Sequence, residues 1–272
     1  MEFLSNLHTH TFYSDGTSTP EQYIEAALEK GFVSLGFSEH AYSPYDIDSC
    51  IPLDKVEPYK EHVQRLREQY AGKLEIYTGI ESDWLNPASP DEYDFIIGSV
   101  HCLKLGEKFV PVDARPAILE AFLANSEESF TWQTLVEQYY RQVADMVKAT
   151  KPTIVGHLDL ITKFNEGNRY FDVNSGWYQE LAAWVVEEIA KTDCIVEVNT
   201  GAISRGYTTV PYPSDFLLGR LRDKSIPLTV SSDAHSAAHL DYHFDQTVEL
   251  LKAAGFSSLM RMQGGSFERC RL

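Results

Sequence analysis

The chain is poor in cysteine and in basic residues, and it has no long apolar run. Its four cysteines, Cys50, Cys102, Cys194 and Cys270, include no CxxC pair, so we expect free thiols and a reducing compartment. Only 23 Lys and Arg face 40 Asp and Glu, for a formal net charge of −17. Because nucleic-acid binding needs basic side chains to displace counterions, this balance argues against a nucleic-acid partner.

Signals for export and membrane insertion are missing as well. The first six residues carry no basic segment followed by an apolar one, which a signal peptide would require. No apolar run approaches the length of a membrane span. We therefore expect a cytoplasmic protein that contacts no membrane. The sequence does not predict its oligomeric state.

Several enzyme classes lack their motifs here. The chain has no Gly-x-Ser-x-Gly nucleophile elbow, and no P-loop or dinucleotide-binding glycine pattern. Cys102 has an apolar successor and no evident base, which argues against a cysteine nucleophile.

What the chain does contain is an alternation of strands and helices. Strands are predicted at residues 3–7, 33–37, 74–80, 95–100, 153–155, 194–198, 228–230 and 258–262, and a hairpin at 104–109. Helices are predicted at residues 18–31, 53–70, 116–123, 131–149, 176–191, 214–223 and 244–254. This order indicates a parallel sheet. About seven repeats, with polar residues at the strand ends, predict one α/β barrel domain of residues 1–272 whose site lies on the C-terminal rim.

Six of the nine histidines lie in short motifs beside an acidic residue or another histidine. The motifs are His8-Thr9-His10 with Ser14-Asp15-Gly16, Ser38-Glu39-His40, Gly79-Ile80-Glu81, Gly98-Ser99-Val100-His101, Gly156-His157-Leu158-Asp159 and Ser231-Ser232-Asp233-Ala234-His235. Imidazole and carboxylate are ligands of zinc, manganese and iron. Nine such ligands are too many for one ion, so the pattern predicts a polynuclear site for metal-assisted hydrolysis.

An ordinary structural origin has to be weighed against this interpretation. A lone His-x-His is short and common, and we would favour solvated or core histidines for it. Here the motifs recur at one strand end after another, which favours metal binding. We expect Asp159 to orient His157 rather than to bind metal. Glu39 is expected to point away from the site, His62 to be a surface residue, and His239 and His243 to be structural.

These motifs, in this order, resemble the polymerase and histidinol phosphatase (PHP) family, in particular its histidinol-phosphate phosphatase branch. The resemblance runs from His8 to His235, and its most specific part is residues 6–16. It implies a distorted (β/α)7 barrel with three divalent metal ions, whether zinc, manganese or iron. It also implies the substrate, L-histidinol phosphate, which would be hydrolysed to L-histidinol and phosphate in histidine biosynthesis.

The resemblance also implies a set of ligands for each ion. His8, His10, Glu81 and Asp233 would hold the first, and Glu81 would bridge to the second, which His101 and His157 complete. Asp15, His40 and His235 would hold the third. A water shared by two cations would attack phosphorus as hydroxide, with Asp233 or His235 as the candidate proton donor to the leaving alcohol.

A phosphate ester should also meet basic side chains near the rim, because guanidinium groups suit bidentate phosphate contacts. Arg169 with its neighbour Tyr170, and Arg205, are our candidate substrate-binding residues, and Lys163 is a weaker one. The alternative for each arginine is that it is an ordinary surface residue without a role in substrate binding. An acidic or aromatic pocket near Tyr42, Asp46 or Tyr207 would suit the cationic part of the substrate.

Three other functions stay open. A phosphoesterase of the same family would act on another small phosphate ester, such as a nucleotide, a cyclic phosphodiester or phosphotyrosine. A regulatory metal-binding module would have no turnover, but structural metal sites usually close their coordination. An amidohydrolase would share the early His-x-His pair, yet such enzymes commonly use a carbamylated lysine where this chain has Glu81.

Overall fold

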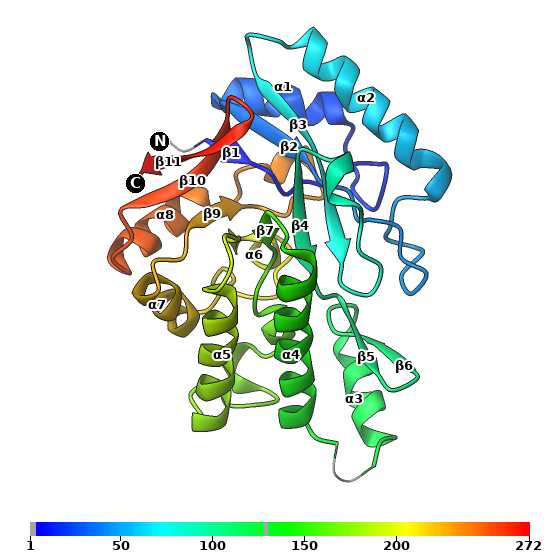
Figure 1. The fold of residues 1–272 in the computed structure, drawn as a ribbon, viewed down its shortest axis with the longest axis vertical. Helices are drawn as coiled ribbons and strands as arrows, with labels where there is room; N and C mark the ends of the chain where they lie inside the picture. Colours follow the sequence, from blue (N-terminus) through cyan, green and yellow to red (C-terminus); the bar gives the residue numbers. More distant parts are fainter. Residues whose placement is uncertain (1–3, 128–129) are drawn as a thin grey trace.

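A sheet of seven parallel strands forms the centre of the molecule in the computed structural model, which describes residues 4–127 and 130–272. In spatial order these strands are β1 (Ser5–Asn6), β2 (Ser34–Phe37), β3 (Glu75–Asp83), β4 (Phe95–Ser99), β7 (Ile154–Val155), β8 (Ile195–Asn199) and β9 (Leu228–Ser231). The sheet curls into a nearly closed barrel (Figure 1). Just past β1 and β9, the His10 amide donates to the Ala234 carbonyl at 2.8 Å, and the Ala234 amide donates to the His8 carbonyl at 3.2 Å. The predicted distorted (β/α)7 barrel is confirmed.

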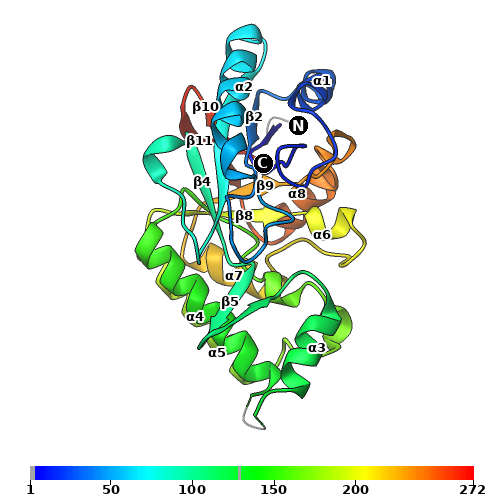
Figure 2. The same cartoon turned by 90° about the vertical axis from the view of Figure 1, so that its right-hand side faces the viewer.

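Helices surround the barrel, as Figures 1 and 2 show. They are α1 (Pro20–Lys30), α2 (Val56–Gln69), α3 (Pro116–Ala124), α4 (Trp132–Thr150), α5 (Gly176–Ile189), α6 (Gly201–Ser204), α7 (Asp215–Asp223) and α8 (Phe244–Ala253). The start of α1 shows how local sequence sets these bounds. Thr19 caps the helix by accepting from the Gln22 amide, Pro20 stands in the first turn, and Gly31 ends the helix in the left-handed region.

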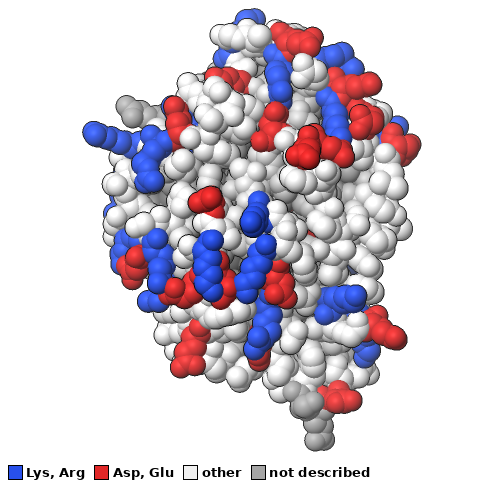
Figure 3. Space-filling model, viewed as in Figure 1, with Lys and Arg blue, Asp and Glu red and all other residues white. Residues whose placement is uncertain are grey.

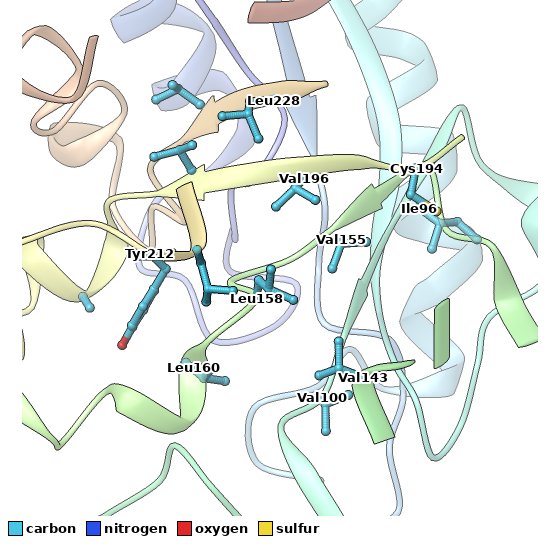
Figure 4. Close-up of a cluster of buried hydrophobic side chains, with 14 of the residues drawn as sticks. Ile96, Val100, Val143, Val155, Leu158, Leu160, Cys194, Val196, Tyr212 and Leu228 are labelled. Atoms are coloured by element: carbon cyan, nitrogen blue, oxygen red, sulfur yellow. The ribbon is translucent and has the colours of Figure 1, made fainter. Parts of the chain in front are cut away.

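The core has an outer and an inner part. Figure 4 shows a portion of the outer part, where Val155 of β7 lies beside Val196 of β8, its register partner. The inner part lies among the strands and consists of Leu7, Tyr77, Phe95, Ile97, Ile154 and Ile195, together with Met262 from the end of the chain. Because apolar side chains fill the barrel, polar groups are left to gather at its rim.

The C-terminal segment corrects one prediction. Residues 258–262 do form a strand, β10 (Ser258–Gln263), but β10 pairs antiparallel with β11 (Ser266–Arg271) in a separate sheet. The amides of Gly264 and Gly265 donate to Glu75 and Tyr77 near the start of β3. With Met262 in the inner core, this hairpin closes the N-terminal end of the barrel, opposite the rim that carries the site.

Other element bounds shift by a few residues. Of the predicted first strand, Phe3 lies outside the described residues and only Ser5–Asn6 is strand. β3 continues to Asp83, so Glu81 lies inside the strand and not beyond its end. The hairpin is confirmed as β5 (Cys102–Leu105) and β6 (Lys108–Pro111). In Figure 1 this hairpin and α3 to α5 form a lobe toward which β4 points.

The surface carries acidic and basic side chains side by side. On the face seen in Figure 3, Lys and Arg are interspersed with Asp and Glu. On α5, for example, Glu188 pairs with Lys148 and Lys191 at 3.0 and 2.8 Å. The four cysteines are buried free thiols, as expected. Within residues 4–127 and 130–272 no helix has the length and apolar character to cross a membrane.

Candidate metal centre

The His8 and His10 side chains lie just past β1, fully buried, with ring centroids 5.1 Å apart. Their Nε2 atoms lie 3.8 and 3.3 Å from Oδ1 of Asp233. Asp233 adopts φ 46°, a left-handed conformation that Asp visits more readily than most residues but at some cost. The end of β9 is therefore bent so that this carboxylate faces the two imidazoles from across the barrel seam.

Glu81 is the centre of the cluster. Its Oε2 lies 3.2 Å from Nε2 of His8, 3.5 Å from Nε2 of His10 and 2.9 Å from Nδ1 of His40. Its Oε1 lies 3.2 Å from Nε2 of His101 and 2.9 Å from Nε2 of His157. Five imidazoles thus surround one carboxylate that is 1% exposed. Since its two oxygens face different histidines, Glu81 is placed to bridge two cations.

Asp15 brings a third group together at the outer edge. Its Oδ1 lies 3.7 Å from Nε2 of His40, and its Oδ2 lies 3.2 Å from Nε2 of His235. The turn that carries Asp15 depends on Gly16, because a Cβ there would lie 2.1 Å from the His10 carbonyl oxygen. That close approach folds the turn back onto the histidine pair.

The ligand atoms gather into groups whose members lie within 4.8 Å of one another. The groups are His8, His10 and Asp233; His40, Glu81 and His101; and His10, Asp15, His40 and His235. They overlap the three sets that the resemblance implies, but His10 and His40 each belong to two groups. His157 is in none of the groups, and it joins the cluster through its Nε2, which lies 2.9 Å from Oε1 of Glu81. The structure therefore brings all nine predicted side chains into one cluster.

Unpartnered buried atoms show that this cluster suits cations. Nε2 of His8, both ring nitrogens of His10, Nδ1 of His157 and Oε2 of Glu81 are buried without a hydrogen-bond partner. Buried polar groups usually find a partner, and leaving one unmade costs about 1–3 kcal/mol. Divalent cations between the imidazoles and carboxylates would satisfy the atoms that face the cluster, and the donor set is the one that zinc, manganese and iron accept.

The pKa values show how strongly these groups interact. Burial opposes charge on Glu81, but the histidines around it hold its pKa well below the usual range. Burial likewise opposes charge on His101, but Glu81 and Asp83 raise its pKa well above the usual value. His10 differs, because burial and the neighbouring His40 and His235 lower its pKa to about 3. A neutral His10 keeps a lone pair free for a cation.

Glu197 on β8 is a functional residue that the sequence analysis missed. Its Oε2 lies 2.8 Å from Nδ1 of His8 and also accepts from Ser231. Its Oε1 accepts from the His157 amide at 2.7 Å and from Asn199. A fully buried acid between Val196 and Val198 was a usable signal, since buried charges are almost always paired. This carboxylate orients the His8 ring so that Nε2 faces the cluster.

Asp159 does not orient His157, contrary to our expectation. Its Oδ2 accepts from the Ser214 amide at 2.9 Å, while its Oδ1 is buried without a partner. Burial raises the pKa of Asp159 to about 6. The side chain turns toward the start of α7 because a 3-10 helix, Leu160–Thr162, begins directly after it. The carboxylate that supports His157 is Glu197, through the backbone amide.

Two other acids beside the cluster have supporting contacts. Glu39 points away as predicted, and it accepts from the Thr11 amide and hydroxyl and from Ser14. It thereby holds the loop between His10 and Asp15. Asp83, which the sequence analysis also missed, accepts from the His101 amide at 2.9 Å and lies 3.5 Å from Nδ1 of the same residue.

The remaining histidines lie outside the cluster, but His62 is half-buried and not the surface residue that we expected. Nε2 of His62 lies 2.8 Å from Glu21 and its Nδ1 lies 3.1 Å from the Tyr13 hydroxyl, so it ties α2 to α1. The ring of His239 lies against Tyr242, and His243 precedes α8.

A cavity of about 210 Å³ opens over the cluster. Arg205 lines it and donates from Nη2 to Oδ2 of Asp233 at 3.0 Å and from Nη1 to the Asp233 carbonyl. Lys163 also lines it and donates to the Asp113 carbonyl at 2.8 Å, with the Asp113 carboxylate 3.6 Å away. Asp46 and Tyr207 are in the wall too, whereas Tyr42 is not. The loops after β7 and β8 therefore bring two basic side chains, Lys163 and Arg205, to the mouth of the site.

Arg169 and Tyr170 lie outside this cavity, which corrects the prediction that they contact substrate. The Arg169 side chain is 61% exposed and pairs with Glu120 at 3.5 Å. Tyr170 stacks on Trp132 and donates to Glu120 at 2.6 Å. The physical reason is the turn before them, where the Asn165 side chain accepts from the Tyr170 and Phe171 amides and directs both residues toward α3 and α4.

Comparisons with known proteins agree with this geometry. The sequence model described as PHP domain matches residues 6–201. The histidinol-phosphatase of Bacillus subtilis (strain 168) is 29% identical over 265 residues, which cover 89% of this chain and 97% of that protein.

Two solved structures share the fold. One, from Listeria monocytogenes, has a TM-score of 0.77 at 18% identity and covers 89% of this chain and 99% of its own. The other is histidinol phosphate phosphatase from Lactococcus lactis subsp. lactis, complexed with zinc, L-histidinol and phosphate. It has a TM-score of 0.71 at 21% identity and covers 98% of this chain and 99% of its own.

Proposed function

The chain belongs to the PHP domain family, and from that premise we propose that it is a metal-dependent phosphomonoesterase that hydrolyses L-histidinol phosphate. The observation that carries the proposal is the convergence of eight histidine, aspartate and glutamate side chains, joined by His157 through Glu81, at a cavity whose wall holds Arg205 and Lys163. Metal ions at the base of the cavity and basic side chains in its wall would both attract the phosphate group of an ester. The Bacillus relative of nearly equal length is named for this activity.

We propose that the protein binds three divalent ions through the ligand sets that the family resemblance implies, with Glu81 shared between two of the ions. Zinc, manganese and iron all fit imidazole and carboxylate ligands, and the Lactococcus structure is described with zinc. When bound, such ions acidify water and neutralise charge on a phosphoryl group.

The chain's own residues would hold the ester and move a proton. Arg205 donates to Asp233, and its Nη1 also lies 3.1 Å from Nδ1 of His235. These contacts hold the guanidinium at the cavity wall before any substrate binds. Guanidinium is suited to the non-bridging oxygens of phosphate. The leaving alkoxide needs a proton, and Asp233 and His235 beside Arg205 are the candidate donors.

The cavity also bears on the size of the substrate. At about 210 Å³ it lies below the usual range of roughly 300–1,000 Å³ for ligand pockets. A phosphate group with a small organic part suits such a space better than a folded phosphoprotein does. Another small phosphate ester is the remaining alternative within this family.

The deciding experiment is phosphate release from L-histidinol phosphate against a panel of phosphomonoesters and phosphodiesters, with metal content measured on the same sample. We expect kcat/KM to be highest for L-histidinol phosphate. Equal rates across the panel would leave a general phosphoesterase, and a fully metallated protein without turnover would favour a regulatory module.

The Arg205→Lys variant tests the phosphate contact. Lysine keeps the charge but loses the forked donors, so we expect kcat/KM to fall by about tenfold and inorganic phosphate to inhibit less strongly. Arg169→Lys is the matched control, because Arg169 lies outside the cavity, and it should behave as the unmodified protein does. Unchanged phosphate inhibition in Arg205→Lys would contradict the assignment.

A further inference from the structure

Asp46 differs from the other carboxylates that line the cavity. Asp233 pairs with Arg205 at 3.0 Å, Asp113 lies 3.6 Å from Lys163, and Asp15 lies 3.2 Å from His235. Asp46 accepts only from the hydroxyl of Ser49, at 3.1 Å, and among the described residues no ion pair reaches it. Asp46 is thus an exposed carboxylate in the cavity wall that has no basic partner among the described residues.

The loop that carries Asp46 is anchored on both sides. At its base the Ile51 amide donates to the His40 carbonyl at 2.9 Å. At its outer end the Tyr45 ring stacks on Phe109 of β6, with centroids 4.0 Å apart. Figure 2 shows the segment after β2 running toward the β5–β6 hairpin. Asp46 is thus held beside the cavity by contacts that do not involve its own carboxylate.

The barrel topology places Asp46 across from the two basic residues. In the strand order β1, β2, β3, β4, β7, β8, β9, Asp46 follows β2, whereas Lys163 and Arg205 follow β7 and β8. In a closed ring of seven strands, each of these pairs is three positions apart, which is the largest possible separation. The cavity therefore has its two basic side chains on one side, each beside a carboxylate, and the unpaired carboxylate of Asp46 on the other.

This polarity matches a substrate that carries opposite charges at its two ends. Resting on the proposed function, we infer that Asp46 binds the cationic nitrogen of the organic part of the substrate and selects esters that have one. A phosphate held toward Arg205 and Lys163 leaves the rest of a small molecule directed toward β2. An ammonium group there would supply the charge partner that Asp46 lacks, and a neutral alcohol would not.

The test compares selectivity and not activity alone. In the metal-loaded protein, kcat/KM is measured for L-histidinol phosphate and for p-nitrophenyl phosphate, whose organic part is uncharged. We expect Asp46→Asn to lower the ratio of the two values roughly fivefold, through KM for L-histidinol phosphate, which is the scale of a partly exposed ion pair. The reduction should shrink at high salt, because ions screen such a pair.

Asp48→Asn is the matched control, since Asp48 is an exposed acid of the same loop that lies outside the cavity wall, and it should keep the ratio. If Asp46→Asn also keeps the ratio while the unmodified protein prefers L-histidinol phosphate, the Asp46 assignment is overturned and the proposed function stands. If the unmodified protein shows no such preference, the proposed function fails and this inference fails with it.

Discussion

Replacing Glu81 with glutamine is expected to lower phosphate release on the order of 10³-fold and to strip the protein of metal. Glu81 contacts five histidines through two oxygens. Glutamine has one acceptor oxygen, and its amide nitrogen would direct hydrogens at imidazole nitrogens that should face cations. The histidines that face Oε1 and those that face Oε2 would lose the carboxylate that they share. Metal content by plasma mass spectrometry and kcat measured on the same preparation check this result.

The control for this variant is Glu75→Gln. Glu75 lies at the opposite end of β3, where it accepts from the Gly264 amide, and its removal should leave metal content and kcat unchanged. A Glu81→Gln protein that kept its metals and stayed within tenfold of the original kcat would rule out a bridging role. A melting curve on each variant separates metal loss from unfolding.

The rim of the barrel is the part of the site that sequence predicts well. Nearly all of the motifs that carry the candidate metal ligands follow an apolar run, and parallel strands put their carboxyl ends on one rim. Asp15 and His235 therefore meet at 3.2 Å although 220 residues separate them in the chain. Sequence alone could not show that His10 and His40 each lie between two groups, because this depends on distances that only the structure gives.

The errors arise where a side chain's direction depends on a local turn. Arg169 was predicted to contact substrate because it follows a rim strand, but the Asn165 turn directs it to Glu120. Asp159 was predicted to orient His157 from its spacing, but the chain turns into a 3-10 helix directly after it. In neither case does the number of residues from the strand determine the direction.

The C-terminal hairpin was missed for a different reason. It interrupts the strand-helix alternation on which the barrel prediction depends. Gly264 and Gly265 both have positive φ, and a Gly-Gly pair between two strand-like segments is a recognised hairpin signal. Only the structure shows what the hairpin does, since its contacts with Glu75 and Tyr77 span almost 190 residues.

Replacing Glu197 with glutamine is expected to lower activity and metal affinity by roughly 100-fold, although Glu197 is not a candidate ligand. In the native arrangement Nδ1–H of His8 donates to Oε2 of Glu197, which leaves the Nε2 lone pair for a cation. A glutamine amide in that place would donate to Nδ1 and put the proton on Nε2, the wrong tautomer for metal binding. In the flipped orientation, the glutamine NH₂ group would instead face two other donors, the His157 amide and the Asn199 side chain.

Either orientation also removes a charge from a buried pair, so we expect the free energy of unfolding to fall by roughly 3 kcal/mol. Loss of stability alone would lower the amount of active protein but not the metal affinity of the folded fraction. Metal titration below the melting temperature therefore separates the two effects. Glu188→Gln removes a glutamate of similarly low exposure on α5, far from the histidines, and should leave metal affinity unchanged. If Glu197→Gln bound metal as tightly as that control, the tautomer of His8 would not depend on Glu197.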